Sequence, residues 1–340
     1  SRPLRMTSYI VRRLLLIIPT VFLALSFLFF LFFALPGDPV NLIAGGAERN
    51  PDPITVRQIT ERYGFDNPLW VQFKDYWVRT LQWDLGESFQ TRRSVNDVLG
   101  ERAVNSLRLG IWAIIIEVVV GISVGLLSAI RRYSIADRLT TIVTAGASAI
   151  PVFVLGFVLQ YAFAVQPNKW DWPEWARLRT SMIGPDDWTF FFIPVGEQWR
   201  YLILPAVTLA SVSTALAARM TRGSMLEVLR ADYMRTAKAK GLSDRQVVAR
   251  HGLRNAMLPV VTLIGIDFGT VIGAAVLTET VFSWPGLGSM IASSVTQRDL
   301  PITLGLTLAV VLAYSFINLL VDLSYAWFDP RIRLDKGGTR

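Results

Sequence analysis

The chain contains no cysteine, and His251 is the single histidine among its 340 residues. Without cysteine the chain has no disulfide and no thiolate that could bind a soft metal ion. One histidine does not suffice for a site built from several imidazoles, so we predict no metal ligands. The absence of cysteine leaves the redox compartment of the protein undetermined.

The sequence also lacks the phosphate-binding loop of P-loop nucleotide hydrolases. That loop has the pattern G-x-x-x-x-G-K-[ST], and the dipeptide Gly-Lys does not occur in the chain. The zinc motif H-E-x-x-H and the calcium loop of EF-hands are missing as well. We therefore expect a chain that is not an enzyme, with no catalytic residues and no cofactor of its own.

Charged residues make up only 18% of the sequence, whereas hydrophobic residues make up 52%. Soluble domains average about 25% charged residues. Residues 14–35 carry no charge at all, and a membrane-spanning helix needs about 20 such residues. Because runs of this length recur, the sequence predicts an all-α polytopic membrane protein with six transmembrane helices, at about 11–35, 103–130, 139–165, 202–222, 258–279 and 301–327.

The distribution of Lys and Arg predicts the orientation of these helices. The segments 1–13, 131–138, 219–257 and 329–340 are rich in bases and poor in acids, whereas the connecting segments between them carry more acids than bases. Positive loops stay on the cytoplasmic side, so both termini are predicted to be cytoplasmic. The basic start before an apolar run resembles a signal peptide, but the run exceeds the about 7–15 residues of a signal. We expect an uncleaved first span.

The spans and loops divide the chain into four predicted regions. These are the cytoplasmic N-terminus with the first span (1–35), an extracytoplasmic segment (36–102), a five-span core with a cytoplasmic loop at 223–257 (103–330), and a cytoplasmic tail (331–340). The outer segments 36–102 and 166–201 are rich in aromatic residues. They form either an aromatic belt at the membrane interface or a docking surface for a soluble partner.

Four acidic residues fall inside or at the ends of predicted spans: Glu117, Asp267, Glu279 and Asp322. Such a group costs about 2.5–3.5 kcal/mol at the membrane centre, so it is expected to face a cavity or a partner. The first three are candidates for lining a substrate or proton pathway. The alternative is a structural hydrogen bond between helices, which suits Glu279 because it lies near the end of a span.

The cytoplasmic stretch 232–260 reads DYMRTAKAKGLSDRQVVARHGLRNAMLPV. Asp232 begins a short helix that Gly241 ends as a C′ glycine, and Ser243 with Gln246 predicts a capping box for a second helix. Tyr233, Ala237 and Gly241 share one side of the first helix. Such a basic helix with small residues suits close docking by another protein, or else it enforces topology and touches anionic lipid.

This stretch resembles the cytoplasmic EAA loop of ABC-importer permeases of the peptide/nickel branch, in which the dipeptide/oligopeptide permease B-like proteins fall. That branch reads close to DYxRTAxAKGLSxxxVxxxHxxRNAxLPV, and this chain matches every specified position. The generic E-A-A-x-x-x-G form is not kept, since Arg235-Thr236-Ala237 replaces it. The stretches 12–40, 279–291 and 321–333 also resemble those permeases, so the resemblance extends over nearly the whole chain.

The resemblance implies the type I importer fold and the partners of such a permease in a bacterial inner membrane. These are a second homologous permease chain in a heterodimer, one or two P-loop ATPase subunits that bind ATP and Mg²⁺, and an extracytoplasmic substrate-binding protein; no nucleic acid is expected. The residues implied to couple to the ATPase are Asp232, Tyr233, Arg235, Thr236, Ala237, Lys238, Lys240, Gly241 and Leu242. We expect Tyr233, Ala237 and Gly241 to form a close-fitting face. Arg235, Lys238 and Lys240 are expected to form its polar rim.

On the outer side, Trp284, Pro285 and Gly286 are candidates for contacting the binding protein or for gating the pathway. The resemblance favours di- or oligopeptides as the solute, with nickel or another small solute as an alternative. A secondary transporter driven by an ion gradient is the alternative mechanism, although the repeats and paired intramembrane charges expected of one are not evident. A channel or a membrane scaffold would not explain the several permease-like motifs.

Overall fold

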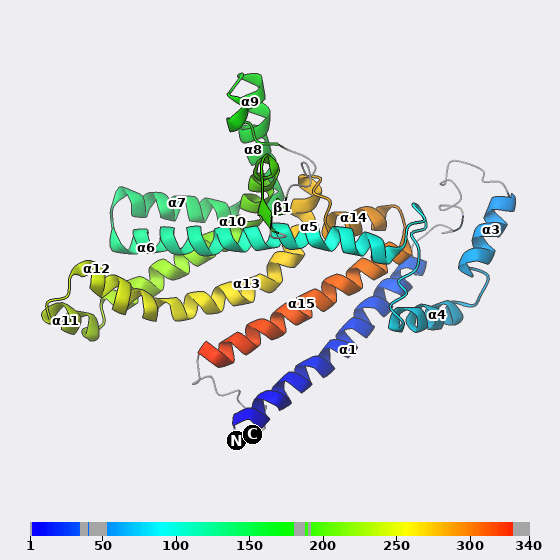
Figure 1. Cartoon of the computed structure of the whole chain (residues 1–340), viewed down its shortest axis with the longest axis horizontal. Coiled ribbons are helices and arrows are strands. Elements are labelled where there is room, and N and C mark those ends of the chain that lie inside the picture. Colours follow the sequence, from blue (N-terminus) through cyan, green and yellow to red (C-terminus); the bar gives the residue numbers. More distant parts are fainter. Residues whose placement is uncertain (1, 35–39, 41–52, 180–187, 190–191, 329–340) are drawn as a thin grey trace. The chain divides into compact units, whose positions relative to one another are not determined.

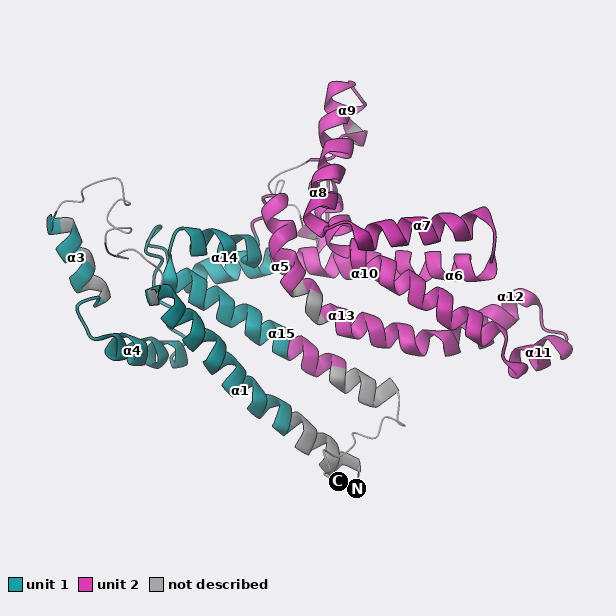
Figure 2. Cartoon of the chain, turned by 180° about the vertical axis from the view of Figure 1, so that it is seen from behind, with its two compact units in different colours: residues 1–105, 286–315 teal, residues 106–285, 316–340 magenta. Residues whose placement is uncertain are grey.

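The computed structural model describes residues 2–34, 40, 53–179, 188–189 and 192–328. These residues form two compact units, unit 1 with residues 1–105 and 286–315 and unit 2 with residues 106–285 and 316–340 (Figure 2). Nearly all regular structure in them is helical (Figure 1). The exception is a short antiparallel pair, in which β1 (Trp188–Thr189) is hydrogen-bonded to β2 (Ile193–Pro194). The all-α class predicted from the sequence is therefore confirmed.

The first helix, α1 (Arg2–Ala34), supplies one wall of unit 1. A helix satisfies its backbone hydrogen bonds internally, which an apolar segment in lipid requires. The side chains of Ile18, Leu23 and Phe27 are exposed on α1, as expected of residues that face lipid, whereas Leu25 and Phe29 are buried. α1 therefore presents one face to lipid and another to the core of its unit.

Four further elements of unit 1 pack around that buried face: α4 (Leu69–Leu81), the first turns of α5 (Val95–Ile116), α14 (Leu287–Thr296) and the first half of α15 (Leu300–Phe328). The unit also includes α3 (Pro53–Tyr63). The ring of Phe29 lies 5.4 Å from that of Phe73 and 5.6 Å from that of Tyr76. Aromatic contacts thus join α1 to α4, and Ile302 of α15 is fully buried in the same core.

A buried carboxylate fixes the loop before α5 to the start of α15. Asp299 is only 2% exposed. Its Oδ1 accepts a hydrogen bond from the backbone N–H of Phe89 at 3.1 Å, and its Oδ2 accepts one from the hydroxyl of Ser88. Because a buried charge is tolerated only when it is hydrogen-bonded, this cluster stabilises the end of unit 1 where α15 begins.

Unit 2 is built around one long helix, α10 (Gln198–Leu229). Against it pack the end of α5, the π-helical turn η1 (Glu117–Gly121), α6 (Ile122–Ile130), α7 (Ile135–Ala149), α8 (Val152–Gln160) and α13 (Arg254–Val281). Leu202 and Leu209 of α10 are buried together with Leu109 of α5 and Val271 of α13. α8 continues into η2 (Tyr161–Val165), α9 (Gln166–Lys169) and the 3₁₀ turn η3 (Glu174–Ala176).

Two glycines bring η1 and α6 unusually close to α10. A Cβ atom on Gly121 would lie 2.8 Å from Cβ of Ala217, and one on Gly125 would lie 2.4 Å from the carbonyl oxygen of Ala218. Small residues four apart are the usual means of close helix packing in membranes. The stretch 121–125 also fits the pattern G-x-S-x-G of serine hydrolases, but Ser123 is exposed within the helix and the glycines serve packing.

Four helices in the described residues are long and apolar enough to cross a membrane: Val11–Phe33, Val95–Ile130, Gln198–Leu229 and Leu300–Val321. Two bent pairs, Ile135–Ala149 with Val152–Lys169 and Asp244–Phe268 with Gly273–Val281, bring the number to six if each pair is one span. The six predicted spans fall on these elements. The chain is therefore an all-helical membrane protein with four to six spans.

The predicted span 139–165 is not one continuous helix. Its two halves are inclined by 111°. The break lies at Ile150 and Pro151, because proline has no N–H to donate and disfavours helical backbone in the residue before it. Ile150 accordingly adopts φ −89° and ψ 129°. The sequence placed a proline there, but it did not reveal the size of the bend.

The compact units do not follow the four predicted regions, since residues 286–315 belong with the first 105 residues. The predicted regions were defined by the side of the membrane on which each segment lies, not by packing. They stay a prediction: 1–35, 36–102, 103–330 and 331–340. The tail 331–340 and much of the segment 36–52 lie outside the described residues.

The close approach at Gly125 generates a stability prediction. Gly125→Ala should lower the free energy of unfolding by about 1–3 kcal/mol, because the new methyl group overpacks against the backbone of α10. Gly110→Ala on α5 is the matched control: its new Cβ has nothing within 4 Å, so it should be neutral or up to about 1 kcal/mol stabilising. Denaturant unfolding of the purified protein measures both. Equal effects of the two variants would contradict the packing described here.

Candidate functional site

The loop of unit 2 that was predicted to be cytoplasmic connects α10 to α13 through two short helices (Figure 1). The first, α11 (Asp232–Ala239), begins two residues after the cap of α10. Asp232 lies in its first turn and Lys238 in its last. The helix dipole favours a negative charge near the N-terminus and a positive charge near the C-terminus, as found here. Short helices of this length are marginal alone, so α11 depends on packing.

That packing comes from the chain itself. Met234 and Ala237 of α11 are buried together with Val247, and Leu242 packs against them. Val247 begins η4 (Val247–Leu253), the π-helical segment that leads into α13. The close fit extends to Gly252, where a Cβ would lie 2.7 Å from Cε of Met225 on α10. α11 is therefore held against the ends of both long helices.

The turn after α11 has the predicted geometry. Gly241 adopts a φ of +82°, the left-handed conformation that glycine tolerates best, and its N–H donates to the carbonyl of Lys238. Ser243 and Gln246 form the predicted capping box at the start of α12 (Asp244–Gln246). Lys238 Nζ lies 2.7 Å from Oδ1 of Asp244 and spans the turn. The helix–glycine–capped-helix design is confirmed.

The exposed face of α11 differs from the face expected. Asp232, Tyr233, Arg235, Thr236, Lys238 and Lys240 are exposed, and Gly241 is exposed beside them. Ala237 is only 7% exposed and faces its own chain. Ala237 therefore packs against Val247 of η4 and does not belong to an outward face with Tyr233 and Gly241. The hydroxyl of Tyr233 accepts a hydrogen bond from Asn255 Nδ2 at 3.2 Å.

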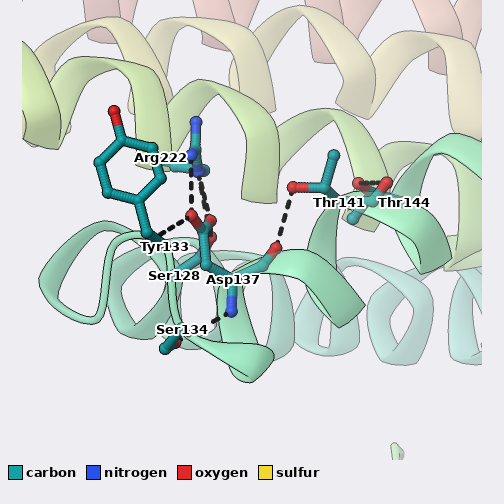
Figure 3. Close-up of polar contacts among 7 residues, drawn as sticks. All are labelled: Ser128, Tyr133, Ser134, Asp137, Thr141, Thr144 and Arg222. Carbon is teal, nitrogen blue, oxygen red and sulfur yellow. Dashed lines mark hydrogen bonds and ion pairs between the residues drawn. The ribbon is translucent and has the colours of Figure 1, made fainter.

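A polar cluster that was not predicted from the sequence fixes the C-terminal part of α10 (Figure 3). Arg222 of α10 donates to both carboxylate oxygens of Asp137 on α7, with Nε–Oδ1 at 2.7 Å and Nη2–Oδ2 at 3.0 Å. Asp137 also accepts from the hydroxyl of Ser128 on α6 and from the N–H of Tyr133. Such a bidentate pair is strong and directional, so α6, α7 and α10 are joined at one point.

One sequence signal could have located this cluster. Ser134 caps α7 and its hydroxyl accepts a hydrogen bond from the N–H of Asp137, so the pattern S-x-x-D marks the start of the helix. The pattern places Asp137 at a helix start in the cytoplasmic loop. It does not name Arg222, which lies 85 residues later, as the partner.

The candidate pathway acids lie inside unit 2. Glu279 is 0% exposed and its Oε1 accepts a hydrogen bond from the hydroxyl of Ser106 at 2.6 Å. Glu117 is 1% exposed, and Asp267 is half-buried. In this conformation Glu117 and Glu279 are thus enclosed between helices, and Glu279 makes the interhelical hydrogen bond that was the structural alternative. Pathway lining stays a prediction for all three.

The candidate outer residues lie where the chain passes from unit 2 to unit 1, between Pro285 and Gly286. Trp284 is 1% exposed and packs in the core of unit 2. Its backbone N–H donates to the carbonyl of Glu279 at 2.8 Å. A buried indole offers no surface to a soluble protein, so the gating role is the one that remains open to Trp284 in this conformation.

Two protein families match different parts of this chain, and together they cover most of its length. Residues 121–334 match the family described as binding-protein-dependent transport system inner membrane component. Residues 6–110 match the N-terminal domain described for such membrane components. The chain belongs to the binding-protein-dependent permeases.

Individual relatives agree with this assignment. The glutathione transport system permease protein GsiC of Escherichia coli is 38% identical over 328 residues, which cover 96% of this chain and 99% of the relative. GsiC of Shigella dysenteriae shows the same identity and coverage. A crystal structure of an amino acid ABC transporter with histidines has a TM-score of 0.50 at 14% identity, covers 68% of this chain and 94% of that chain, and shows the shared fold.

Membership in this family settles the general role of the chain. The permease is a multi-pass inner-membrane subunit of an ABC importer, and it works with an ATPase and a binding protein. It is not itself the ATPase, in agreement with the missing P-loop. The secondary-transporter alternative is replaced by this assignment.

The Asp137–Arg222 pair generates a double-mutant prediction for the permease. Asp137→Ala and Arg222→Ala should each lower the free energy of unfolding by about 3 kcal/mol, because each leaves a charge without its partner. The double variant should lose clearly less than the sum of the two. Denaturant unfolding of the purified protein provides the comparison, and Arg230→Ala, an exposed arginine at the end of α10, should leave stability unchanged. Strict additivity would show that the pair makes no energetic contact.

Proposed function

We propose that this permease forms half of the translocation pathway of a peptide importer and receives the motion of an ATPase subunit through α11. The observation that carries the proposal is the construction of α11. Its inner face is anchored by Met234 and Ala237, while Tyr233, Arg235 and Lys240 are exposed. A helix that is held in this way and exposes a basic face can bind a partner and pass the partner's displacement on to α10 and α13.

The other half of the pathway is a second, homologous permease chain, and one or two ATPase subunits bind below the pair. This arrangement follows from the resemblance in the cytoplasmic loop and agrees with the family assignment. Closure of the ATPase pair would then move α11 of each permease. The spans would rock between inward-facing and outward-facing states, which is a coupling between distinct sites through a two-state element.

On the outer side we propose that the segment 36–102 meets the binding protein. In the described part of this segment, Trp70, Leu81 and Trp83 are exposed. Nearby, a recess of about 660 Å³ in unit 1 has a mixed lining that includes four acids and one arginine: Glu61, Asp75, Asp84, Glu87 and Arg79. Exposed aromatic residues beside a charged recess favour a protein contact over an aromatic belt alone.

We propose di- or oligopeptides as the solute. The relative GsiC is named for glutathione, which is itself a tripeptide. A nickel route finds no support in this chain, because it has no cysteine and its single histidine lies in the cytoplasmic loop. ATP hydrolysis by the complete transporter in lipid discs should rise when the binding protein is loaded with a dipeptide or with glutathione. Stimulation by Ni²⁺ complexes but by neither peptide would contradict the proposed solute.

The turn at Gly241 provides a test of coupling. Gly241→Val should uncouple ATP hydrolysis from uptake, because a β-branched residue at φ +82° costs about 1–3 kcal/mol, which corresponds to a loss of the docking conformation by a factor of about 5–150. Gly241→Asn should retain coupling, since asparagine tolerates this conformation and a Cβ here has nothing within 4 Å in the chain itself. Uptake per ATP in proteoliposomes measures both variants.

The pair of variants distinguishes two reasons for the glycine. Loss of coupling in both would show that the partner lies against Gly241, as expected of a close-fitting face. Loss in Gly241→Val alone would show that the backbone conformation is what the loop requires. Normal uptake in Gly241→Val would contradict the coupling role of the turn.

A further inference from the structure

A recess of about 520 Å³ opens on unit 2 where η2 and α9 meet the start of α10. Two bases line it, Lys169 of α9 and Arg179, together with the polar residues Asn168 and Tyr201. The other described residues in its lining are apolar, so none of the described lining residues is acidic. The recess therefore offers positive charge and hydrogen-bond donors to an anion.

Backbone hydrogen bonds hold the two sides of this recess together. After η3, the N–H of Leu178 donates to the carbonyl of Phe163 in η2 at 3.3 Å. The N–H of Arg179 donates to the carbonyl of Arg200 in the first turn of α10 at 3.1 Å. Leu178 also packs against the buried cluster that contains Ala164. The position of Arg179 beside α10 is therefore fixed by backbone bonds and by packing.

The chain does not neutralise the two bases of the recess. The neighbouring Arg177 has an acidic partner, because its Nη2 lies 3.6 Å from Oδ1 of Asp171. Neither Lys169 nor Arg179 forms an ion pair with an acid in the part of the chain that the structure describes. Lys169 Nζ lies 6.0 Å from the ring centroid of Tyr161, a cation–π contact that leaves its charge in place. Two uncompensated positive charges in one recess attract an anion.

The helical segment that leads to the recess exposes an apolar surface. α8 and η2 project from the other helices of unit 2 (Figure 1), and their side chains Phe157, Val158 and Tyr161 are exposed. Trp170 and Trp172, directly after α9, are exposed as well. Such aromatic side chains gather at the boundary between hydrocarbon and headgroups. An apolar helix, aromatic rings and two bases thus follow one another in the order in which a phospholipid presents its acyl chains and its phosphate.

We propose that this recess binds the phosphate group of a membrane phospholipid, whose acyl chains lie along the exposed surface of α8 and η2. The guanidinium of Arg179 can donate two parallel hydrogen bonds to phosphate oxygens, and Lys169 adds a second positive charge. The hydroxyl of Tyr201 can donate to a remaining oxygen. The lipid then bridges α9 to the start of α10. The proposal does not depend on which solute the importer carries.

The charge of the recess determines which phospholipid fits best. The phosphodiester of phosphatidylglycerol carries a negative charge that nothing in its headgroup cancels, whereas phosphatidylethanolamine adds an ammonium group that the two bases repel. The recess therefore favours phosphatidylglycerol. Removal of one base should weaken its binding about fivefold. Inorganic phosphate offers the same anionic chemistry without acyl chains, so a test must distinguish it from a lipid.

The test uses the complete transporter, purified in mild detergent and stripped of lipid. Native mass spectrometry measures the binding of phosphatidylglycerol and of phosphatidylethanolamine, each with and without inorganic phosphate as a competitor. Lys169→Gln, Arg179→Gln and the double variant are compared with the wild type. Lys74→Gln, which removes an exposed lysine of α4 outside the recess, is the matched control.

A second measurement needs no variant. Photoactivatable phosphatidylglycerol or phosphatidylethanolamine, with the reactive group on an acyl chain, is added to the wild-type transporter in lipid discs. The crosslinked peptides of the permease are then identified. The proposal predicts crosslinks within residues 152–169 that are stronger with phosphatidylglycerol, since its phosphate is the group that the recess holds.

Tighter binding of phosphatidylglycerol, weakened in both single variants but kept in Lys74→Gln, supports the proposal. Unchanged binding in the double variant overturns it, and so does equal binding of the two lipids to the wild type. Displacement of the lipid by an equal concentration of inorganic phosphate identifies a site for free anions and overturns the lipid assignment. If the variants of Lys169 and Arg179 fail to assemble, the crosslinks decide, and their absence from residues 152–169 overturns the proposal.

Discussion

The close approach of α10 to η1 and α6 is the constraint on which unit 2 depends. Hydrophobic burial cannot hold helices together in lipid as it does in water, so the helices associate by close contact and by polar bonds. Gly121 and Gly125 provide the contact against Ala217 and Ala218. Polar bonds add to this contact, because Arg222 of α10 donates hydrogen bonds to Ser128 of α6 and to Asp137 of α7.

α10 also connects the helical core of unit 2 to the short helix α11. It runs without a break from Gln198 to Leu229, and α11 begins three residues later. The bonds of Arg222 to Ser128 and Asp137 fix its C-terminal part to α6 and α7, while the cluster of Met234, Ala237 and Val247 fixes α11 to η4. We propose that a displacement of α11 moves α10 and the start of α13 together.

The features that could be predicted from the sequence are local ones. The apolar runs predicted the membrane helices, Gly241 predicted the left-handed turn, and Ser243 with Gln246 predicted the capping box. Each depends on residues a few positions apart, for which spacing and backbone preference suffice. The family resemblance supplied the role of the loop, and the comparisons with known permeases confirmed the family.

The features that could not be predicted depend on contacts between distant segments. The small size of Ala237 is compatible with either face of α11, and only the position of η4 shows that it points inward. Trp284 at a loop is typical of a surface contact, yet the core of α5, α10 and α13 encloses it. The partner of Asp137 and the bend at Pro151 likewise follow from tertiary packing.

The central claim is that α11 docks on an ATPase subunit and carries its motion. Because the chain has no cysteine, a single introduced thiol reports one position without further substitutions. Ala239→Cys, on the exposed end of α11, should form a crosslink to an ATPase subunit in native membranes, with a yield that changes when ATP is added. Leu81→Cys, at an exposed position in the segment predicted to be extracytoplasmic, should form none. An Ala239→Cys protein that assembles with its ATPase but never crosslinks to it would contradict the account.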